Sequence, residues 1–204
     1  MKKYLVEFIG TFFLMFIILA SVRNAGQFAP IAIGTTLVVM VYAGGYISGA
    51  HYNPAVSLAV FIRGKINFSE MFIYWVVQIV AASIAAFLAK SMFNPGEVVE
   101  NIAGTQWILA AEFIGTFGLA YVVLQVATSS KTEGNNYYGL AIGFTVLSFA
   151  YALGPISGGA FNPAVAIGAS LYGAFSWSII WIYLVACLSA GILAGLVYKY
   201  LNED

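Results

Sequence analysis

The triplet Asn-Pro-Ala occurs twice in the sequence, as Asn53, Pro54 and Ala55 and again as Asn162, Pro163 and Ala164. Asparagine is a strong N-cap and proline is favoured at the first helical position, so each triplet predicts the start of a helix. A helix N-terminus carries about half a positive charge, and an asparagine amide donates hydrogen bonds. Together these groups would accept polar, uncharged molecules and repel cations.

The helices that these triplets begin are short, whereas six other apolar segments are long. Residues 53–62 and 162–171 would each extend roughly 15 Å, half of a ~30 Å hydrocarbon core. The chain is 62% hydrophobic and 8% charged, which indicates a membrane protein because a soluble domain carries about a quarter charged residues. The predicted spans are Tyr4–Val22, Pro30–Ile47, Met71–Ala89, Ile108–Ala127, Tyr138–Leu153 and Ser178–Tyr198.

The two triplets belong to an internal repeat. Residues 32–59 and 141–168 are identical at half of 28 aligned positions, and Glu7 and Glu112 begin two copies of EFIGTF. Each half has three spans, an odd number, so the second half must be inverted relative to the first, as in many transport proteins. We expect one all-α membrane domain over residues 1–204, with repeats of about 1–100 and 101–204 that join in the polar stretch Ser91–Thr105, which includes Gly96.

Charge and cysteine content limit the other functions. The formal net charge is zero and no basic cluster is present, so we expect no nucleic-acid partner. The single cysteine, Cys187, excludes an internal disulfide and a CxxC metal site, and no pattern indicates an enzyme, a metal or a cofactor. With the N-terminus in the cytoplasm, more basic residues fall inside than outside, which favours cytoplasmic N- and C-termini. The predicted cytoplasmic residues are Lys2, Lys3, Arg63, Lys65, Lys131 and Lys199, against Arg23 and Lys90 outside.

The paired triplets, their contexts SGAHYNPAV and SGGAFNPAV, and the paired EFIGTF segments resemble the aquaporin, or major intrinsic protein, family over essentially the whole chain. The resemblance implies six transmembrane helices and two re-entrant half-helices that meet at the membrane midplane. It also implies a passive channel for water and small uncharged solutes, assembled as a homotetramer in the cell (plasma or inner) membrane. Backbone or side chains of the irregular segments before the triplets would line the pore: Gly49, Ala50, His51, Gly158 and Ala160.

The outer constriction departs from the family pattern. Most aquaporins have arginine three positions after the second asparagine, where this chain has Val165. Motif alignment places Ile33, Ala150 and Gly159 at the other positions of the selectivity filter. A filter of these residues should be wide and apolar, so we expect glycerol, urea, ammonia or metalloid hydroxides to pass as well as water.

Three further features leave alternatives open. Glu7 and Glu112 either brace the irregular loops or couple a secondary transporter to ions, since an ionisable group in a span is a functional candidate. His51 lines the pore, braces the loop or titrates as a gate. Gly191 and Gly195 form a GxxxG pattern that serves internal packing or a subunit contact.

Overall fold

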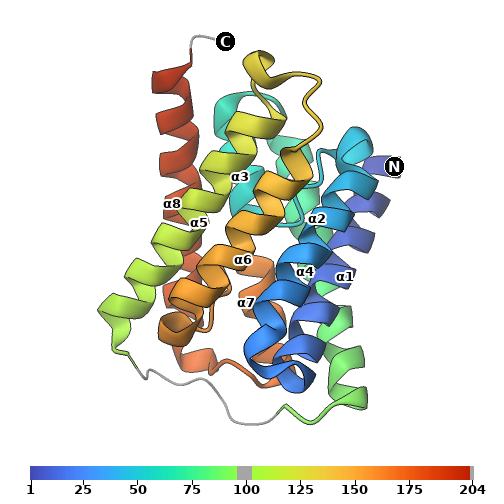
Figure 1. Cartoon of the computed structure of the whole chain (residues 1–204), viewed down its shortest axis with the longest axis vertical. Coiled ribbons are helices and arrows are strands. Elements are labelled where there is room, and N and C mark those ends of the chain that lie inside the picture. Colours follow the sequence, from blue (N-terminus) through green and yellow to red (C-terminus); the bar gives the residue numbers. More distant parts are fainter. Residues whose placement is uncertain (96–102, 203–204) are drawn as a thin grey trace.

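The computed structural model of the chain describes residues 1–95 and 103–202, and all its regular elements are helices (Figure 1). Gly96 and the middle of the predicted joint between the repeats, residues 96–102, lie outside the described residues. The long helices are α1 (Lys2–Asn24), α2 (Ala29–Ser48), α4 (Phe68–Met92), α5 (Thr105–Ala127), α6 (Tyr138–Ser157) and α8 (Ile180–Leu201). The short helices are α3 (Pro54–Arg63) and α7 (Pro163–Tyr172), with single 3-10 turns at Gly26–Phe28, Ser130–Thr132 and Trp177–Ile179.

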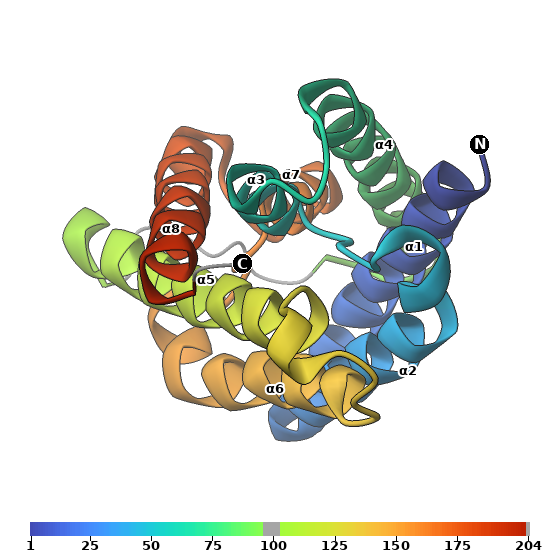
Figure 2. The same cartoon turned by 90° about the horizontal axis from the view of Figure 1, so that it is seen from above.

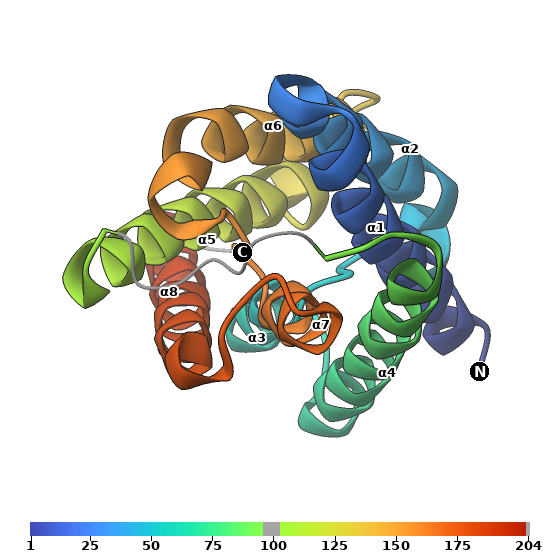
Figure 3. The ribbon, with the colours of Figure 1, turned by 90° about the horizontal axis from the view of Figure 1, so that it is seen from below.

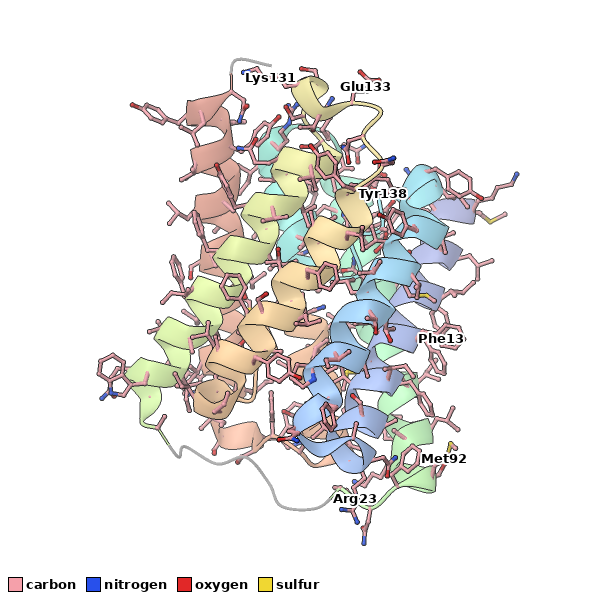
Figure 4. The ribbon with its side chains drawn as sticks, viewed as in Figure 1. Phe13, Arg23, Met92, Lys131, Glu133 and Tyr138 are labelled. Carbon is pink, nitrogen blue, oxygen red and sulfur yellow. The ribbon has the colours of Figure 1, made fainter. Side chains whose placement is uncertain are left out.

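Each of the six long helices, two of them (α2 and α8) taken with the preceding turn, is long and apolar enough to cross a membrane. Large apolar side chains remain exposed on the outside of the bundle, among them Phe13 on α1 (Figure 4). Such side chains are compatible with a lipid environment, where apolar surface needs no polar cover. The prediction of six spans and two short helices is confirmed.

The long helices form a ring that α3 and α7 close. Neighbours around the ring are α8, α5, α6, α2, α1 and α4, and both short helices pack against α4 and α8. Views along the bundle show α3 and α7 one behind the other (Figures 2 and 3). In Figure 1, α3 lies in the upper half of the bundle and α7 in the lower half. The half-helices therefore enter from opposite faces.

The chain ends and the loops define two faces. The end of α8, Lys131 and Glu133 lie on one face, which we call the inner face after the predicted orientation, and Arg23 and Met92 lie on the opposite, outer face (Figure 4). The names follow the distribution of basic residues.

Two helix boundaries differ from the sequence prediction for local reasons. Helix α4 begins at Phe68 rather than Met71 because the Asn67 side chain accepts a hydrogen bond from the backbone of Glu70, an N-cap. Helix α6 continues through Pro155 to Ser157, beyond the predicted end of this span at Leu153, although proline usually breaks a helix. Proline removes one backbone donor, but the N–H of Gly158 still closes the last turn on the carbonyl of Gly154.

Glycines permit the closest helix crossings. A Cβ on Gly143 of α6 would lie 2.5 Å from the Gly34 carbonyl oxygen of α2, and one on Gly191 of α8 would lie 2.5 Å from the Ala55 carbonyl oxygen of α3. A Cβ on Gly195 would lie 2.7 Å from the Ile62 side chain. The GxxxG pattern of α8 therefore packs inside the chain, against α3.

Candidate functional site

The N-termini of α3 and α7 are tied to each other by their capping asparagines. Asn53 accepts a hydrogen bond from the N–H of Ala55 at 2.9 Å, and its Nδ2 donates to the Phe161 carbonyl at 2.9 Å. Asn162 accepts from Ala164 at 2.9 Å, and its Nδ2 donates to the Tyr52 carbonyl at 2.8 Å. The two half-helix tips therefore meet, and each amide nitrogen keeps a second proton for another acceptor.

The segments that lead into the tips have unusual backbone. Gly49 and Gly158, at φ 86° and 85°, end α2 and α6 in the left-handed conformation. Tyr52 and Phe161 adopt the same region at φ 50° and 49° although they carry side chains. A bulky residue at positive φ is strained and persists only where its surroundings hold it.

Glu7 holds the first of these segments. One of its carboxylate oxygens accepts from the Ser48 hydroxyl (2.7 Å) and the N–H of His51 (2.9 Å). The other accepts from the N–H of Tyr52 (2.7 Å) and from Gln78 Nε2 (2.9 Å). Four donors on two oxygens satisfy a buried ionised carboxylate, and Glu7 is 0% exposed.

Glu112 holds the second segment in the same way. It accepts from the Ser157 hydroxyl (2.7 Å) and from the N–H groups of Ala160 (3.0 Å) and Phe161 (2.6 Å). The fourth donor is the thiol of Cys187, with a sulfur-to-oxygen distance of 3.7 Å. Cys187 occupies the position that Gln78 has in the first repeat, 109 residues earlier, so a weaker donor replaces an amide.

A cavity of about 470 Å³ leads from the outer face to the half-helix tips. Its wall is mainly apolar and is formed by long helices of both repeats. Leu14 and Ile18 come from the first repeat, and Leu119 and Ile142 come from the second. Both capping asparagines line it. Each tip can therefore present its remaining amide proton to a molecule in the cavity.

The residues predicted for the constriction lie together in the wall of this outer cavity. They are Ile33, Ala150, Gly159 and Val165. Val165 is 3% exposed and follows the second triplet at the start of α7. Gly159 has φ 67°, and a Cβ there would lie 3.2 Å from the Gly154 backbone, so a side chain at this position would be strained.

A second cavity of about 680 Å³ opens at the inner face. Lys65, Glu70 and Glu133 line it, which gives this mouth a more polar wall. The inner and outer cavities share two lining residues, His51 and Val123. Their combined lining therefore runs from Arg23 at the outer face to Glu133 at the inner face, past both asparagines.

Of the other residues predicted to line the pore, Ala50, Gly158 and Ala160 border the outer cavity, and Gly49 borders the inner cavity. Neither cavity is lined by Glu7 or Glu112. The structure thus separates the two carboxylates from the cavities and places the predicted backbone segments along them.

The His51 ring is fixed where the two cavities meet. Its Nδ1 lies 3.0 Å from the Ser57 hydroxyl, and its ring packs edge-on to Tyr74 at 5.0 Å. Gln78 Nε2 also donates to the Ser57 hydroxyl at 3.1 Å. Hydrogen bonds therefore connect the cavity wall to Gln78, which itself bonds Glu7.

Sequence reasoning missed the tyrosines that support the loops. Tyr74 donates to the Ser48 carbonyl at 2.7 Å, and Tyr183 donates to the Ser157 carbonyl at 2.5 Å. These tyrosines are 109 residues apart, as are their acceptors. Extending the repeat alignment into α4 and α8 pairs the two tyrosines by sequence alone, so the repeat offset was the signal that could have found them.

The comparisons with known proteins agree with this architecture. Residues 1–198 match the Major intrinsic protein family. The chain is 34% identical to "Aquaporin NIP1-1" of Zea mays over 98% of its length and 75% of that protein. It is 33% identical to "Aquaporin NIP2-1" of Oryza sativa subsp. japonica, covering 100% of this chain and 72% of that one. The "aquaglyceroporin from Plasmodium falciparum" superposes with a TM-score of 0.83 at 20% identity, over 97% of this chain and 95% of that chain.

Proposed function

Because the chain belongs to the major intrinsic protein family, we propose that its two connected cavities are one permeation path. The chain is a multi-pass membrane protein and a passive channel for water and small uncharged solutes. Family members are channels rather than enzymes. The observation that supports the path most strongly is the shared lining at His51 and Val123, with both asparagines in the wall.

The half-helix tips give the path its preference for neutral molecules. Two N-termini of about half a charge each present roughly one positive charge to a solute. At about 4 Å and an effective dielectric near 20, that repels a cation by on the order of 4 kcal/mol. Barriers of this kind exclude cations from aquaporin-type pores. The free amide protons of Asn53 and Asn162 and the carbonyls of the loop segments replace hydrogen bonds that a neutral solute loses on leaving water.

The constriction sets which neutral solutes pass. Ile33, Ala150, Gly159 and Val165 offer neither a fixed charge nor an arginine fork to water. Such a wall filters weakly by size, so small solutes such as urea, ammonia, glycerol and metalloid hydroxides pass along with water. Highly hydroxylated sugars are disfavoured because apolar walls replace few of their hydrogen bonds.

The alternative of an ion-coupled transporter is opposed by the state of Glu7 and Glu112. Each carboxylate already accepts four hydrogen bonds and lies outside the cavity walls. A coupling group must exchange its partner with an ion during transport, which would leave backbone N–H groups buried and unpaired. Their place in the structure supports bracing of the two loops instead.

The test is solute-by-solute swelling of proteoliposomes with the native protein, Val165→Arg and Val165→Met. The methionine variant lengthens the side chain without adding a charge or hydrogen-bond donors. We expect Val165→Arg to raise the ratio of water to glycerol permeability by about tenfold, a difference of ~1.4 kcal/mol between barriers. Val165→Met should change the ratio less. An equal ratio in native protein and Val165→Arg would refute this account of the constriction.

We further propose the family's homotetramer, with both termini cytoplasmic in the cell membrane. The six-to-two distribution of basic residues between the inner and outer sides supports this orientation. Mass measurement in native detergent micelles tests the assembly. Modification of a cysteine introduced at Lys2 tests the orientation. A monomer by mass, or labelling from outside intact cells, would contradict the respective claim.

A further inference from the structure

The outer mouth has a positive charge that does not belong to the constriction. Arg23, at the end of α1, lines the outer cavity and projects from the outer face of the bundle (Figure 4). It is the one cationic side chain among the described residues that line this cavity. It interacts electrostatically with the phenol of Tyr172, which also lines the cavity at the end of α7.

The repeat shows that the arginines at the two ends of the path occupy different repeat positions. The inner end of the repeat pairs Arg63, at the end of α3, with Thr128 beyond α5. The corresponding outer positions carry Tyr172 and Arg23, at offsets of 109 and 105. Each end of the path therefore has one arginine in this pair of positions. At the inner end it belongs to the half-helix α3, and at the outer end it belongs to the long helix α1.

The two arginines have different surroundings. Arg63 is 8% exposed, donates to the Thr128 carbonyl at 3.3 Å and packs over the Tyr198 ring at 4.6 Å. It lines neither cavity. Arg23 is exposed and borders the outer cavity. The first arginine holds helix ends together, whereas the second exposes its charge to molecules entering the path.

Among the described residues, no carboxylate lines the outer cavity to oppose the charge of Arg23. Glu70 and Glu133 line the inner cavity, whereas Glu7 and Glu112 are enclosed by loop donors. None of these four lines the outer cavity. A charge at the mouth of a narrow, low-dielectric path acts strongly on ions that enter, because the walls focus its field.

We propose that Arg23 is a specificity-determining residue that repels cations at the outer mouth and supplies there the fixed positive charge that Val165 lacks. It acts on the charge of a solute and leaves neutral solutes unaffected. This inference rests on the proposed permeation path. It adds a second electrostatic barrier, near the surface and sensitive to salt, to the barrier at the half-helix tips.

Guanidinium and urea form a suitable pair of probes, because both are small and planar and differ in charge. Their uptake is measured at low ionic strength in the same proteoliposomes, for native protein, Arg23→Gln and Arg23→Glu. A unit charge near the path in largely aqueous surroundings predicts about a threefold rise in the guanidinium-to-urea ratio for Arg23→Gln. Removing and then reversing the charge predicts about a ninefold rise for Arg23→Glu.

Lys90 provides the matched control, since it is exposed near the outer end of α4 and does not line the cavity. Lys90→Gln and Lys90→Glu should leave the ratio unchanged, and about 1 M salt should abolish the effect of Arg23→Glu, because the Debye length falls to about 3 Å.

An equal ratio in Arg23→Glu and Lys90→Glu would overturn the inference, as would a parallel change in urea uptake. Absence of urea uptake by the native protein would instead refute the proposed function, and normal urea uptake by each variant shows that it is folded.

Discussion

Replacing Glu7 by glutamine tests whether this carboxylate holds the first loop. The carboxylate accepts from Ser48 and His51 at one oxygen and from Tyr52 and Gln78 at the other. A glutamine has one oxygen, so its amide nitrogen must face two of these donors. If it faces the second pair, Gln78 can turn its amide, because its Oε1 has no hydrogen-bond partner among the described residues. The N–H of Tyr52 has no such rescue.

The magnitude follows from these contacts. One buried backbone N–H left without an acceptor costs about 1–3 kcal/mol. The two retained hydrogen bonds lose the charge of their acceptor, which weakens each by about 1 kcal/mol. Relief of burying an ionised group offsets part of this loss. We therefore expect Glu7→Gln to lower the free energy of unfolding by about 2–4 kcal/mol.

Unfolding in mixed detergent micelles measures this loss, and water permeability per folded protein measures the pore. Glu133→Gln is the control because Glu133 is an exposed carboxylate at the inner face. We expect the control to stay within about 0.5 kcal/mol of the native protein. A Glu7→Gln protein as stable as the control, with native permeability, would refute the argument that Glu7 braces the loop.

Three further changes test neighbouring parts of the structure. Gly191→Ala should destabilise the protein by about 1–3 kcal/mol, because its Cβ would lie 2.5 Å from the Ala55 carbonyl oxygen. The control is Gly154→Ala, because nothing lies within 4 Å of a Cβ at that position. Equal stabilities of the two variants would contradict the prediction. Asn162→Asp removes the donor to the Tyr52 carbonyl and places a negative charge at the half-helix tips. Guanidinium uptake relative to urea uptake should therefore rise by about tenfold or more. An unchanged ratio of the two uptakes would argue against an electrostatic barrier at the tips. His51→Ala should raise water permeability by removing a ring from the place where the two cavities meet, and native and variant permeabilities should stay flat between pH 5.5 and 8. A pH-dependent native profile that the variant loses would show gating by His51.

Most of the fold could be predicted because its signals are local or repeated. Apolar length indicated the spans, and the caps at Asn53 and Asn162 fixed where the half-helices begin. The duplication required the halves to be inverted, which places the two caps together. Hydropathy alone missed the first turn of α4, where the capping pair Asn67 and Glu70 carried the signal.

The parts of the site that were missed depend on contacts between distant helices. The thiol of Cys187 donates to Glu112 across 75 residues, a contact that nothing in its local sequence indicated. The role of Ser57 as a bridge between His51 and Gln78 depends on how α3 and α4 face each other. The position of Arg23 depends on where the end of α1 lies relative to the cavity mouth, and Arg23 is far in the sequence from both triplets, so no local pattern indicates it.

Osmotic measurements under imposed ion gradients test the central claim most directly. Proteoliposomes containing the native protein are compared with empty liposomes for water and urea flux, with and without proton and sodium gradients. A path formed by two opposed half-helices predicts faster water and urea flux than in empty liposomes, at a rate that is independent of both ion gradients. Flux that follows either gradient, or no increase over empty liposomes, would contradict a passive pore past Asn53 and Asn162.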